Sequence, residues 1–452
     1  MAKKQMTRRD LLKSAATVTA GIGTLSTLNV ITRPERVFGA NERVRIGVCG
    51  LRGRGKDHLD AFSHLPNVEI AALCDVDDTV LRKRREEAGG NPRTFVDVRR
   101  MLDDPQIDAI SIATPNHWHA LIAIWACQAG KDVYVEKPCS HNLWEGRQLV
   151  RAAQKYRRIV QHGTQSRSAP AMIEAINQLR AGTFGDIYLS RGLCFKRRDT
   201  IGRAASEAVP RGVDYDLWTG PAPLKPFTQN RFHYNWHWNW ETGNGDLGNQ
   251  GVHQVDAARW GLGVGFPDRI SAMGGHFMFD DDQETPNTLA CTFIFEQPDG
   301  PRKMLEFGVR HWITNGEAGF GRGGPFSRHN AIGTIFYGSK GYLAAGNEDS
   351  FSYESWLGSD QSAGPHGKSG NDHFANFVNC VRSRNAADLH APIEQGHISC
   401  GLVHLANASY RLGRSLRFDA QTERVIDDEE ANALLAGSNR GYRAPFVVSD
   451  EV

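Results

Sequence analysis

The feature that most restricts the fold is an alternation, from Val44 onward, of short β-branched apolar runs with amphipathic stretches of helical length. The apolar runs predict strands at Val44–Cys49, Val68–Cys74, Ala109–Thr114 and Val133–Glu136. The amphipathic stretches predict helices at Lys56–His64, Thr79–Glu87, His117–Ala129 and Leu143–Tyr156. This order is typical of a doubly wound parallel sheet, which binds its ligands at the carboxyl ends of the strands.

Beyond about residue 161 the β-rich runs become longer, which favours an antiparallel sheet in a second domain. These runs are Asp186–Phe195, Arg269–Met278, Thr288–Phe295, Lys303–Val309 and Gly333–Tyr337. Two late helical stretches, Asp372–Ser383 and Gly396–Leu412, are expected to pack back against the body of the protein. The irregular stretches Thr200–Arg231 and Glu317–Arg328 are long enough to serve as lids.

The composition excludes some classes of partner and site. A net charge of +2 and a hydrophobic content of 40% describe an ordinary globular protein without the basic excess of a nucleic-acid binder. The eight cysteines include no close pair with zinc or redox spacing. The histidine pairs His117/His119 and His233/His237 have no cysteine or carboxylate to complete a ligand set, so we expect no metal site.

The first forty residues are read as a twin-arginine export signal. Thr7–Lys13 contains paired arginines and precedes a mildly apolar stretch, Ala15–Ile31, that is too short and too rich in Thr and Gly to span a membrane well. Cleavage is expected near residues 37–40. The sequence then implies transient contact with the twin-arginine translocon and a periplasmic or otherwise exported location. The alternative is a frayed basic N-terminus of a cytosolic enzyme.

A glycine-rich turn follows the first predicted strand, where backbone N–H groups would meet a dinucleotide pyrophosphate. Gly50 and Gly55 occupy the first and last positions of the fingerprint, Arg52 stands at its middle position, and Gly53 and Arg54 complete the turn. Asp75, at the end of the second strand, would bind the adenosine ribose and favour NAD over NADP. The alternatives are a tight turn without a ligand and a solvated aspartate.

Two further motifs stand at the ends of the next strands, where a nicotinamide ring would rest. The first contributes Thr114, Pro115, Asn116 and His119, and the second contributes Glu136 and Lys137 within Val135–Pro138. Together with the glycine turn and the β-rich second half, these motifs resemble the glucose-fructose oxidoreductase and inositol dehydrogenase family (Gfo/Idh/MocA) from about Val44 to Leu412.

This resemblance implies roles for three residues. The lysine of the Glu-Lys-Pro motif, here Lys137, contacts the reacting hydroxyl in that family, and an ammonium there would stabilise a developing alkoxide. His253 matches the family's general base. Its usual partner, an aspartate four residues earlier, is replaced by Asn249, which removes a charge that would stabilise imidazolium. Structural roles for Lys137, beside Glu136, and for His253, in the core, are the alternatives.

Candidate substrate residues lie on both sides of this signature. Trp236, His237 and Trp238 belong to an alternating aromatic and polar run that could stack on a sugar ring. The alternative is a strand whose tryptophans fill the core or an oligomer interface. Asp246 could contact substrate, and either Asp246 or Asp256 could replace the missing carboxylate. Asp256 could equally be a structural hydrogen-bonder. Arg167, which begins the second domain, matches the family's substrate-side strand and is a candidate contact for substrate oxygen.

The sequence therefore predicts an α/β plus α+β protein. Its segments are a signal at 1–40, an NAD-binding Rossmann domain at 41–160, and a substrate and oligomerisation domain at 161–452 with an open antiparallel sheet and C-terminal helices. Chain length also favours two domains. Family precedent favours a homo-dimer or homo-tetramer.

The function expected is that of a nicotinamide-dependent oxidoreductase acting on a sugar, glycoside or polyol hydroxyl. An exported enzyme has no obvious pool of free NAD, so its cofactor would stay bound and be recycled, either between two sugars or within a redox glycoside cleavage. Two other interpretations remain open: a non-catalytic sugar-binding protein that retains the nucleotide, and a cytosolic polyol dehydrogenase with exchangeable NAD.

Overall fold

The computed structural model describes residues 43–298, 300–313, 315–317, 320, 330–346, 351–436 and 441–452. The predicted export signal and most of the predicted Glu317–Arg328 loop lie outside these residues. Within the described part of the chain, no helix combines the length and the hydropathy that a membrane span requires.

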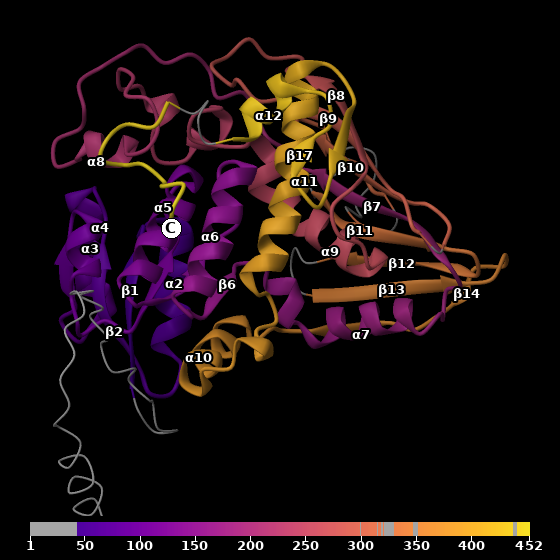
Figure 1. The fold of residues 1–452 in the computed structure, drawn as a ribbon, viewed down its shortest axis with the longest axis horizontal. Helices are drawn as coiled ribbons and strands as arrows, with labels where there is room; N and C mark the ends of the chain where they lie inside the picture. Colours follow the sequence, from indigo (N-terminus) through magenta and orange to yellow (C-terminus); the bar gives the residue numbers. More distant parts are fainter. Residues whose placement is uncertain are drawn as a thin grey trace, which may run out of the picture. The chain divides into compact units, whose positions relative to one another are not determined.

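The first sheet has six parallel strands in the order β3-β2-β1-β4-β5-β6, which confirms the predicted doubly wound fold (Figure 1). Its strands are β1 (Val44–Cys49), β2 (Val68–Cys74), β3 (Arg93–Phe95), β4 (Ala109–Ile112), β5 (Asp132–Val135) and β6 (Val160–His162). Its helices are α2 (Gly53–Ser63), α3 (Asp78–Ala88), α4 (Val98–Leu102), α5 (His119–Gln128) and α6 (Leu143–Lys155). The sequence missed β3 and β6, whose three residues form no apolar run, and α4, whose five residues are fewer than two helical turns.

The strand order reverses at β1, which pairs with β2 on one side and β4 on the other. Beyond the carboxyl end of β1, the Gly50 N–H donates to the Cys74 carbonyl at 2.9 Å, and the Ala113 N–H donates to the Cys49 carbonyl at 2.8 Å. The loops after β1, β2 and β4 are therefore held side by side. A crevice at such a reversal point is where doubly wound sheets bind their ligands.

The second sheet is large and mostly antiparallel, as predicted, with the order β14-β13-β12-β11-β7-β10-β9-β8-β16-β17 and with β15 beside β13. Its central strands are β7 (Ile187–Phe195), β8 (Arg269–Gly275), β9 (Thr288–Phe295), β10 (Lys303–Arg310) and β11 (Ala331–Gly338). Its outer strands are β12 (Gly341–Gly346), β13 (Phe351–Leu357), β14 (Ser362–Ala363), β15 (Gly367–Ser369), β16 (Leu416–Asp419) and β17 (Arg424–Val425). Strands β8, β9 and β10 form an antiparallel meander, and β10 pairs with β7 in parallel.

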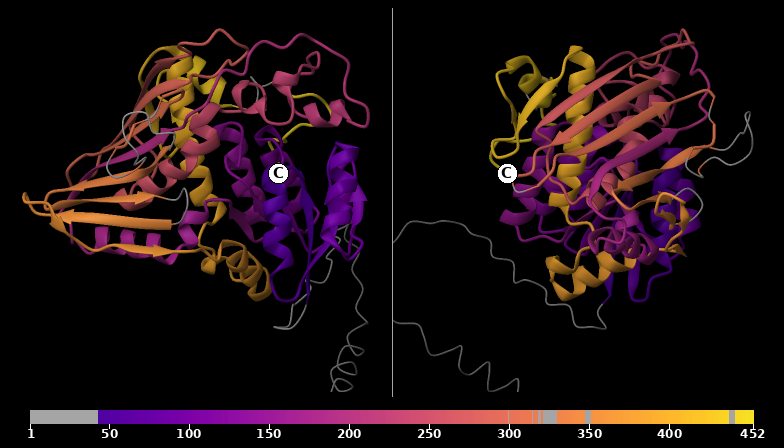
Figure 2. Two further views of the ribbon diagram at one scale, coloured as in Figure 1. Left: turned by 180° about the vertical axis from the view of Figure 1, so that it is seen from behind. Right: turned by 90° about the vertical axis from the view of Figure 1, so that its right-hand side faces the viewer.

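Helices cover one face of this sheet and join it to the first domain (Figure 2). The helices of this half are α7 (Pro170–Arg180), α8 (Tyr215–Thr219), α9 (Val252–Leu262), α10 (His373–Ser383), α11 (Ile393–Leu412) and α12 (Glu429–Leu435). Helix α11 packs on β8, on α9 and on α6, so it lies between the two sheets. On the outward face, Met273 of β8 is 80% exposed.

The predicted boundary at residue 160 does not separate two independent cores. Phe377, Val378 and Val381 of α10 share a buried cluster with Val44 and Leu73 of the first sheet. Near the other end of that sheet, Phe446 packs edge-on against Trp118, and their ring centroids are 5.3 Å apart. Residues from the last fifth of the chain therefore complete the core around the first sheet.

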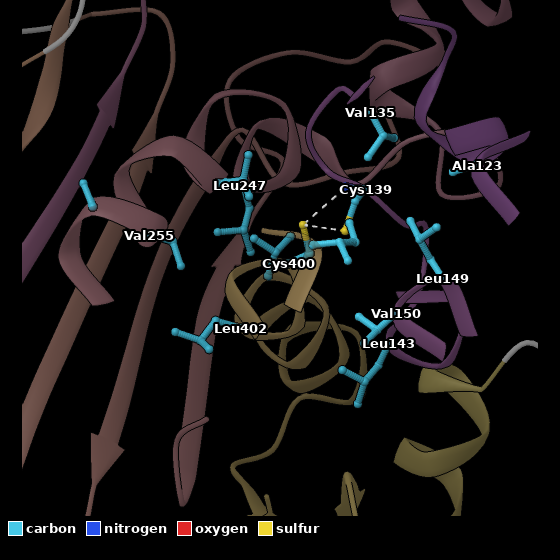
Figure 3. Packing of buried hydrophobic residues seen from close by; sticks show 14 of the residues in the cluster. Ala123, Val135, Cys139, Leu143, Leu149, Val150, Leu247, Val255, Cys400 and Leu402 are labelled. Atoms are coloured by element: carbon cyan, nitrogen blue, oxygen red, sulfur yellow. Dashed lines mark hydrogen bonds between the residues drawn. The ribbon is translucent and has the colours of Figure 1, made fainter. Parts of the chain in front are cut away.

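Two cysteines that are far apart in the sequence meet in the larger core cluster. Cys139, in the loop after β5, lies beside Cys400 of α11, among Leu143, Leu149 and Leu402 (Figure 3). The sequence could not show this contact, because 261 positions separate the two residues.

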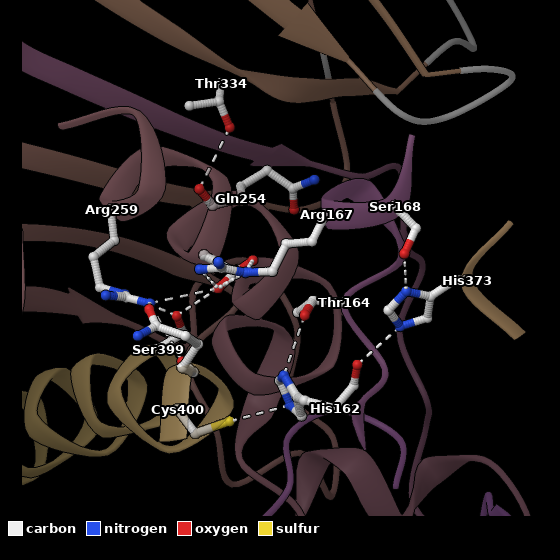
Figure 4. A network of polar contacts seen from close by, with 12 residues as sticks. His162, Thr164, Arg167, Ser168, Gln254, Arg259, Thr334, His373, Ser399 and Cys400 are labelled. Atoms are coloured by element: carbon white, nitrogen blue, oxygen red, sulfur yellow. Dashed lines mark hydrogen bonds and ion pairs between the residues drawn. The ribbon is translucent and has the colours of Figure 1, made fainter. Parts of the chain in front are cut away.

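A buried ion pair links the start of the second domain to α9 and α11 (Figure 4). Arg167 donates from Nε and Nη2 to the two carboxylate oxygens of Asp256, at 2.8 Å each. Ser399 donates to the same carboxylate at 2.6 Å. Burial disfavours the charged Asp256, but Arg167 outweighs it and lowers the pKa of this carboxyl.

Removal of the Asp256 carboxylate tests this linkage. Asp256→Ala is expected to lower the free energy of unfolding by about 3–5 kcal/mol, because the Arg167 guanidinium would stay buried without its partner. The control Glu429→Ala removes an exposed partner of Arg424 and should change it by less than about 1 kcal/mol. Urea unfolding followed by circular dichroism compares the two, and equal effects would contradict the linkage.

Candidate functional site

One cavity of about 500 Å³ follows the carboxyl ends of β1, β2, β4 and β5. Its lining comes from the glycine turn, from the loops after the other three strands, and from residues 217–249 of the second domain. The predicted residues on this lining are Gly50, Arg52, Gly53, Arg54, Asp75, Thr114, Pro115, His119, Glu136, Lys137, Trp236, His237 and Asn249. A single cavity therefore brings together the predicted nucleotide and reaction sites.

The glycine turn approaches the neighbouring backbone too closely for side chains. Gly50 has φ +80°, and a Cβ there would lie 2.6 Å from the Thr114 nitrogen. A Cβ on Gly55 would lie 1.8 Å from the Gly50 carbonyl oxygen. Gly53, the first residue of α2, has open space around the same position. The turn itself therefore requires glycine at positions 50 and 55, whereas Gly53 faces free volume.

Arg52 and Arg54 place positive charge at the start of α2, whose first turn contains no acidic residue. The Arg52 guanidinium lies 3.9 Å from the carboxylate of Asp77, and Arg54 donates from Nε to Glu136 at 2.8 Å. Helix N-termini with this charge distribution attract phosphate groups.

Asp75 is fixed by the backbone of the glycine turn. Its carboxylate accepts from the Leu51 N–H at 2.8 Å and from the Asp77 N–H at 3.0 Å. Burial raises the pKa of Asp75 to about 6. Asp77 also lines the cavity, caps α3 by accepting from the Thr79 N–H at 3.0 Å, and was not singled out from the sequence. The repeated aspartate in Asp75–Asp77 was the available signal.

The part of the predicted lid from residue 210 onward is attached over this edge. Its backbone pairs with the loop after β2: Asp78 N–H donates to the Gly212 carbonyl, and Asp214 N–H donates to the Val76 carbonyl, both at 2.9 Å. The Trp118 indole donates to the Trp218 carbonyl at 3.0 Å. Figure 1 shows α8 at this end of the first sheet. Leu217, Trp218 and Phe232 then line the cavity, so this segment covers the nucleotide crevice.

Glu136 is a buried anion at the centre of the site. It accepts from Arg54 at 2.8 Å and from Gln165 at 3.2 Å, and His58 Nε2 lies 3.1 Å away. Burial disfavours the charged form, but Arg54 and His58 outweigh it and hold the pKa of this carboxyl well below its usual range. Glu136 therefore fixes α2 against the loop that carries Lys137.

Lys137 points from this loop to the second domain. Its Nζ donates to the backbone carbonyl of Asn249 at 2.5 Å. Burial lowers the pKa of Lys137 to about 8, although Glu136 raises it. His119 lies between the two loops, with its ring nitrogens 2.6 Å from the Pro138 carbonyl and 2.7 Å from the Thr114 carbonyl. A neutral imidazole donates only one of these bonds.

Asn249 belongs to a single π-helical turn, Leu247–Gly251, that precedes α9. The sequence predicted that Asn249 and His253 lie on one regular α-helix. The π-helical turn changes their spacing, so this prediction was wrong. The Asn249 amide donates to Asp246 at 3.2 Å. His253 Nδ1 is buried without a hydrogen-bond partner, and burial, followed by the charge of Lys137, lowers the pKa of His253 to about 3.

The aromatic run forms a 3-10 turn, Asn235–Trp238, instead of a strand. Trp236 and His237 stack with their ring centroids 3.6 Å apart and line the cavity. Trp238 is buried against the Arg198 guanidinium, 4.9 Å from its ring centroid.

Several predicted site residues lie outside the cavity lining because other side chains bind them. The Asp246 carboxylate accepts from Arg198 at 2.7 Å and lies 2.9 Å from His311 Nε2. Asn116 donates to Asn244 at 2.8 Å. Arg167, expected to contact substrate, is held by Asp256. Gly55 and His253 do not line the cavity either.

Comparison with protein families gives two adjoining matches. The Gfo/Idh/MocA description "Oxidoreductase family, NAD-binding Rossmann fold" matches residues 44–164. The companion description "Oxidoreductase family, C-terminal alpha/beta domain" matches residues 196–271 and 366–447. Together the two matches cover both halves of the chain.

Curated relatives match a shorter stretch. A glycosyl hydrolase family 109 protein from Shewanella sp. (strain MR-4) is 31% identical over 201 residues, which is 40% of this chain and 44% of that protein. An alpha-N-acetylgalactosaminidase from Shewanella oneidensis is 31% identical over 204 residues, with the same coverage. The chain thus matches less than half the length of these relatives.

Solved structures share the fold over most of the chain. The WlbA dehydrogenase from Bordetella pertussis, in complex with NADH and UDP-GlcNAcA, has a TM-score of 0.61 and 20% identity, covering 84% of this chain and 98% of that one. The aldose-aldose oxidoreductase from Caulobacter crescentus has a TM-score of 0.60 and 18% identity, covering 83% and 100%.

A matched pair of substitutions tests the glycine turn. Gly55→Ala is expected to lower the melting temperature and the amount of bound nucleotide, because the new Cβ collides with the Gly50 carbonyl. Gly265→Ala, between α9 and β8 and away from the cavity, is the control and should keep the parent melting temperature and nucleotide content, since its Cβ would enter open space. Differential scanning calorimetry and the nucleotide released on denaturation give the two readouts. A Gly55→Ala protein with both properties unchanged would refute the geometry.

Proposed function

Because the chain belongs to the Gfo/Idh/MocA family of NAD(P)-dependent oxidoreductases, we propose that it oxidises and re-reduces a hydroxyl-bearing carbon of a carbohydrate on a tightly held NAD. The observation that carries this proposal is the single cavity that joins the glycine turn and Asp75 to Lys137 and the aromatic pair Trp236 and His237. One wall of this cavity suits a dinucleotide, and the other suits a polyhydroxylated ligand.

The residues of the crevice fit NAD. Gly53 leaves backbone open at the start of α2 for a pyrophosphate, and the Thr114 hydroxyl is buried on the lining without a partner. Asp75 and Asp77 place two carboxylates where the adenosine ribose would lie, and they would repel a 2′-phosphate. When bound, NAD accepts a hydride from the substrate carbon and can return it.

Lys137 is the group best suited to exchange a proton with the reacting hydroxyl. A pKa of about 8 keeps part of this amine neutral near physiological pH, which is the condition for a general base. After it takes the proton, the ammonium stays beside the oxygen and can return the proton on reduction. The Asn249 carbonyl, which accepts from Nζ, holds the amine in the cavity.

His253 is poorly suited to act as the general base. A pKa of about 3 leaves its imidazole neutral and weakly basic. The carboxylate that would raise this pKa is missing, since position 249 is an asparagine. We therefore assign proton exchange to Lys137, and we assign His253, which does not line the cavity, no direct part in it.

A carbohydrate substrate is supported by the aromatic wall and by the relatives. The rings of Trp236 and His237 offer flat apolar surface of the kind that packs on the C–H face of a sugar. The WlbA dehydrogenase structure contains a nucleotide sugar, and the Caulobacter enzyme is an aldose oxidoreductase. Retention of the cofactor is supported by the covering segment, whose attachment by backbone hydrogen bonds at residues 212 and 214 opposes exchange.

The second candidate function is redox cleavage of a glycoside, favoured by the match to glycosyl hydrolase family 109 proteins. Oxidation of one ring hydroxyl to a ketone acidifies the neighbouring C–H. Loss of that proton expels the glycosidic oxygen and leaves a carbon-carbon double bond. Water then adds to this double bond, and return of the hydride to the ketone restores the hydroxyl. The cycle consumes one water and no net cofactor.

We also propose that the protein is exported through the twin-arginine pathway and forms a homo-dimer or homo-tetramer. The paired arginines of Thr7–Lys13 support export. Exposed apolar side chains near the outward face of the second sheet, Met273, Phe277 and Met278, support self-association. Terminal sequencing of protein from the periplasmic fraction and light scattering test the two proposals, which an intact N-terminus and a monomeric mass would contradict.

One experiment distinguishes the functions. The purified protein is denatured to identify the released nucleotide, and the intact protein is then incubated with a panel of sugars and glycosides. Reduction of the bound nicotinamide by a sugar supports the oxidoreductase. Release of an aglycone without net reduction supports glycoside cleavage. Bound NAD without any turnover would overturn both in favour of a sugar-binding protein, and released NADP would overturn the role of Asp75 and Asp77.

Replacement of Lys137 tests the proton exchange. Lys137→Ala should lower turnover by at least about 100-fold, because the proton acceptor is lost, while nucleotide content stays unchanged. Lys56→Ala, on the exposed face of α2, is the control and should keep full activity. In the parent enzyme, kcat/KM for oxidation should rise with pH and level off above about 8, as the amine becomes neutral. Full activity of Lys137→Ala, or a rate that falls through this range, would refute the role.

A further inference from the structure

Three potential metal ligands from distant parts of the chain converge in the core. Cys139 lies two residues after Lys137, His162 ends β6, and Cys400 lies in α11. All three side chains are buried. The two Sγ atoms are 3.7 Å apart, Cys400 Sγ lies 3.6 Å from His162 Nε2, and the three ligand atoms all lie within 4.8 Å of one another. Figures 3 and 4 show the two pairs.

The two shortest separations match the edges of a coordination polyhedron. A tetrahedral ion with sulfur at about 2.3 Å and nitrogen at about 2.0 Å places two sulfurs about 3.8 Å apart and sulfur and nitrogen about 3.5 Å apart. The observed distances agree with these values to within about 0.1 Å. The third separation, between Cys139 Sγ and the imidazole, is at most 4.8 Å.

The surroundings of the three residues resemble an outer coordination shell. The Cys139 N–H donates to Cys400 Sγ at 3.4 Å, which would stabilise a thiolate. The Thr164 hydroxyl oxygen lies 3.3 Å from His162 Nδ1. If that nitrogen carries the ring proton, Nε2 presents its lone pair to the sulfur, which is the arrangement of a metal-bound histidine.

We propose that Cys139, His162 and Cys400 bind one thiophilic metal ion, either Zn²⁺ or Cu⁺. Two thiolates and an imidazole are the donor set of these ions and are unsuited to Mg²⁺ or Ca²⁺. Binding releases the two thiol protons to solvent, so the two thiolates neutralise Zn²⁺ and leave one net negative charge with Cu⁺. Among the described residues no fourth His, Cys, Asp or Glu joins the group, which leaves three protein ligands.

This ion would be structural and would act on the site through the backbone. It joins the loop that carries Lys137 to β6 and to α11, which packs between the two sheets. Because the ligands are buried, the ion would be enclosed as the chain folds instead of entering the folded protein. The proposal does not depend on the substrate, and its measurements need no turnover.

Metal content tests the site directly. Untagged full-length protein is produced in media supplemented with zinc or with copper, purified with a reductant, and analysed by mass spectrometry for metals. We expect about one equivalent of Zn²⁺ or Cu⁺ per chain, and less than about 0.1 equivalent in Cys400→Ser and in Cys139→Ser. Cys291→Ser, which removes a buried cysteine of β9, is the control and should keep the parent content. Metal below about 0.1 equivalent in parent protein from both media would overturn the proposal, as would equal content in all variants.

A second measurement does not rely on the variants being well folded. Parent protein refolded with Co²⁺ should show thiolate-to-cobalt charge-transfer absorption, which His162→Gln should shift and the Cys291→Ser control should retain. Peptide mapping without reduction is the counter-test. A Cys139–Cys400 disulfide in most of the protein would overturn the proposal, because oxidised sulfurs have no thiolate to offer a metal. Absence of charge-transfer absorption in correctly refolded protein would overturn it as well.

Discussion

The buried carboxylate of Glu136 is the interaction on which the site depends. A charge without solvent is costly, so this anion persists only because Arg54 and His58 come to it from α2 and Gln165 comes from the start of the second domain. The same contacts set the position of the glycine turn relative to the loop after β5. One charged group thereby fixes the glycine turn and Lys137 relative to each other. Arg54 therefore has a second role besides attracting phosphate, since it neutralises Glu136 next to Lys137.

The asparagine at position 249 has a local explanation. Asp246 is a buried anion that already accepts from Arg198 and lies against His311, and the Asn249 amide donates to the same carboxylate. An aspartate at 249 would place a second negative charge about 3 Å from the first, which is destabilising in a buried site. Asparagine at position 249 thus suits the neighbouring Asp246 carboxylate. The same residue leaves His253 without a carboxylate that would raise its pKa.

The sequence predicted the first sheet and the glycine turn with Asp75, because local patterns carry that information. β1 and β2 begin and end where the apolar runs do, and Gly50, Gly55 and Asp75 follow from a fixed spacing. It could not show contacts that depend on distant partners. Arg167 has the same residue type whether it faces substrate or Asp256, and only the fold brings Asp256 to it. The π-helical turn at 247–251, the turn in place of a strand at 235–238, and the meeting of Cys139 with Cys400 likewise depend on tertiary packing.

The packing of α10 against β1 has a consequence for biosynthesis. The apolar side of the first strand is covered by a helix that is translated more than 320 residues later. A nascent chain therefore cannot bury the amino-terminal sheet completely while it is still being made, and final consolidation awaits nearly the whole polypeptide. Contacts of such long sequence separation slow folding. The nucleotide-binding half, although almost contiguous in sequence, therefore cannot complete its core before α10 has been made.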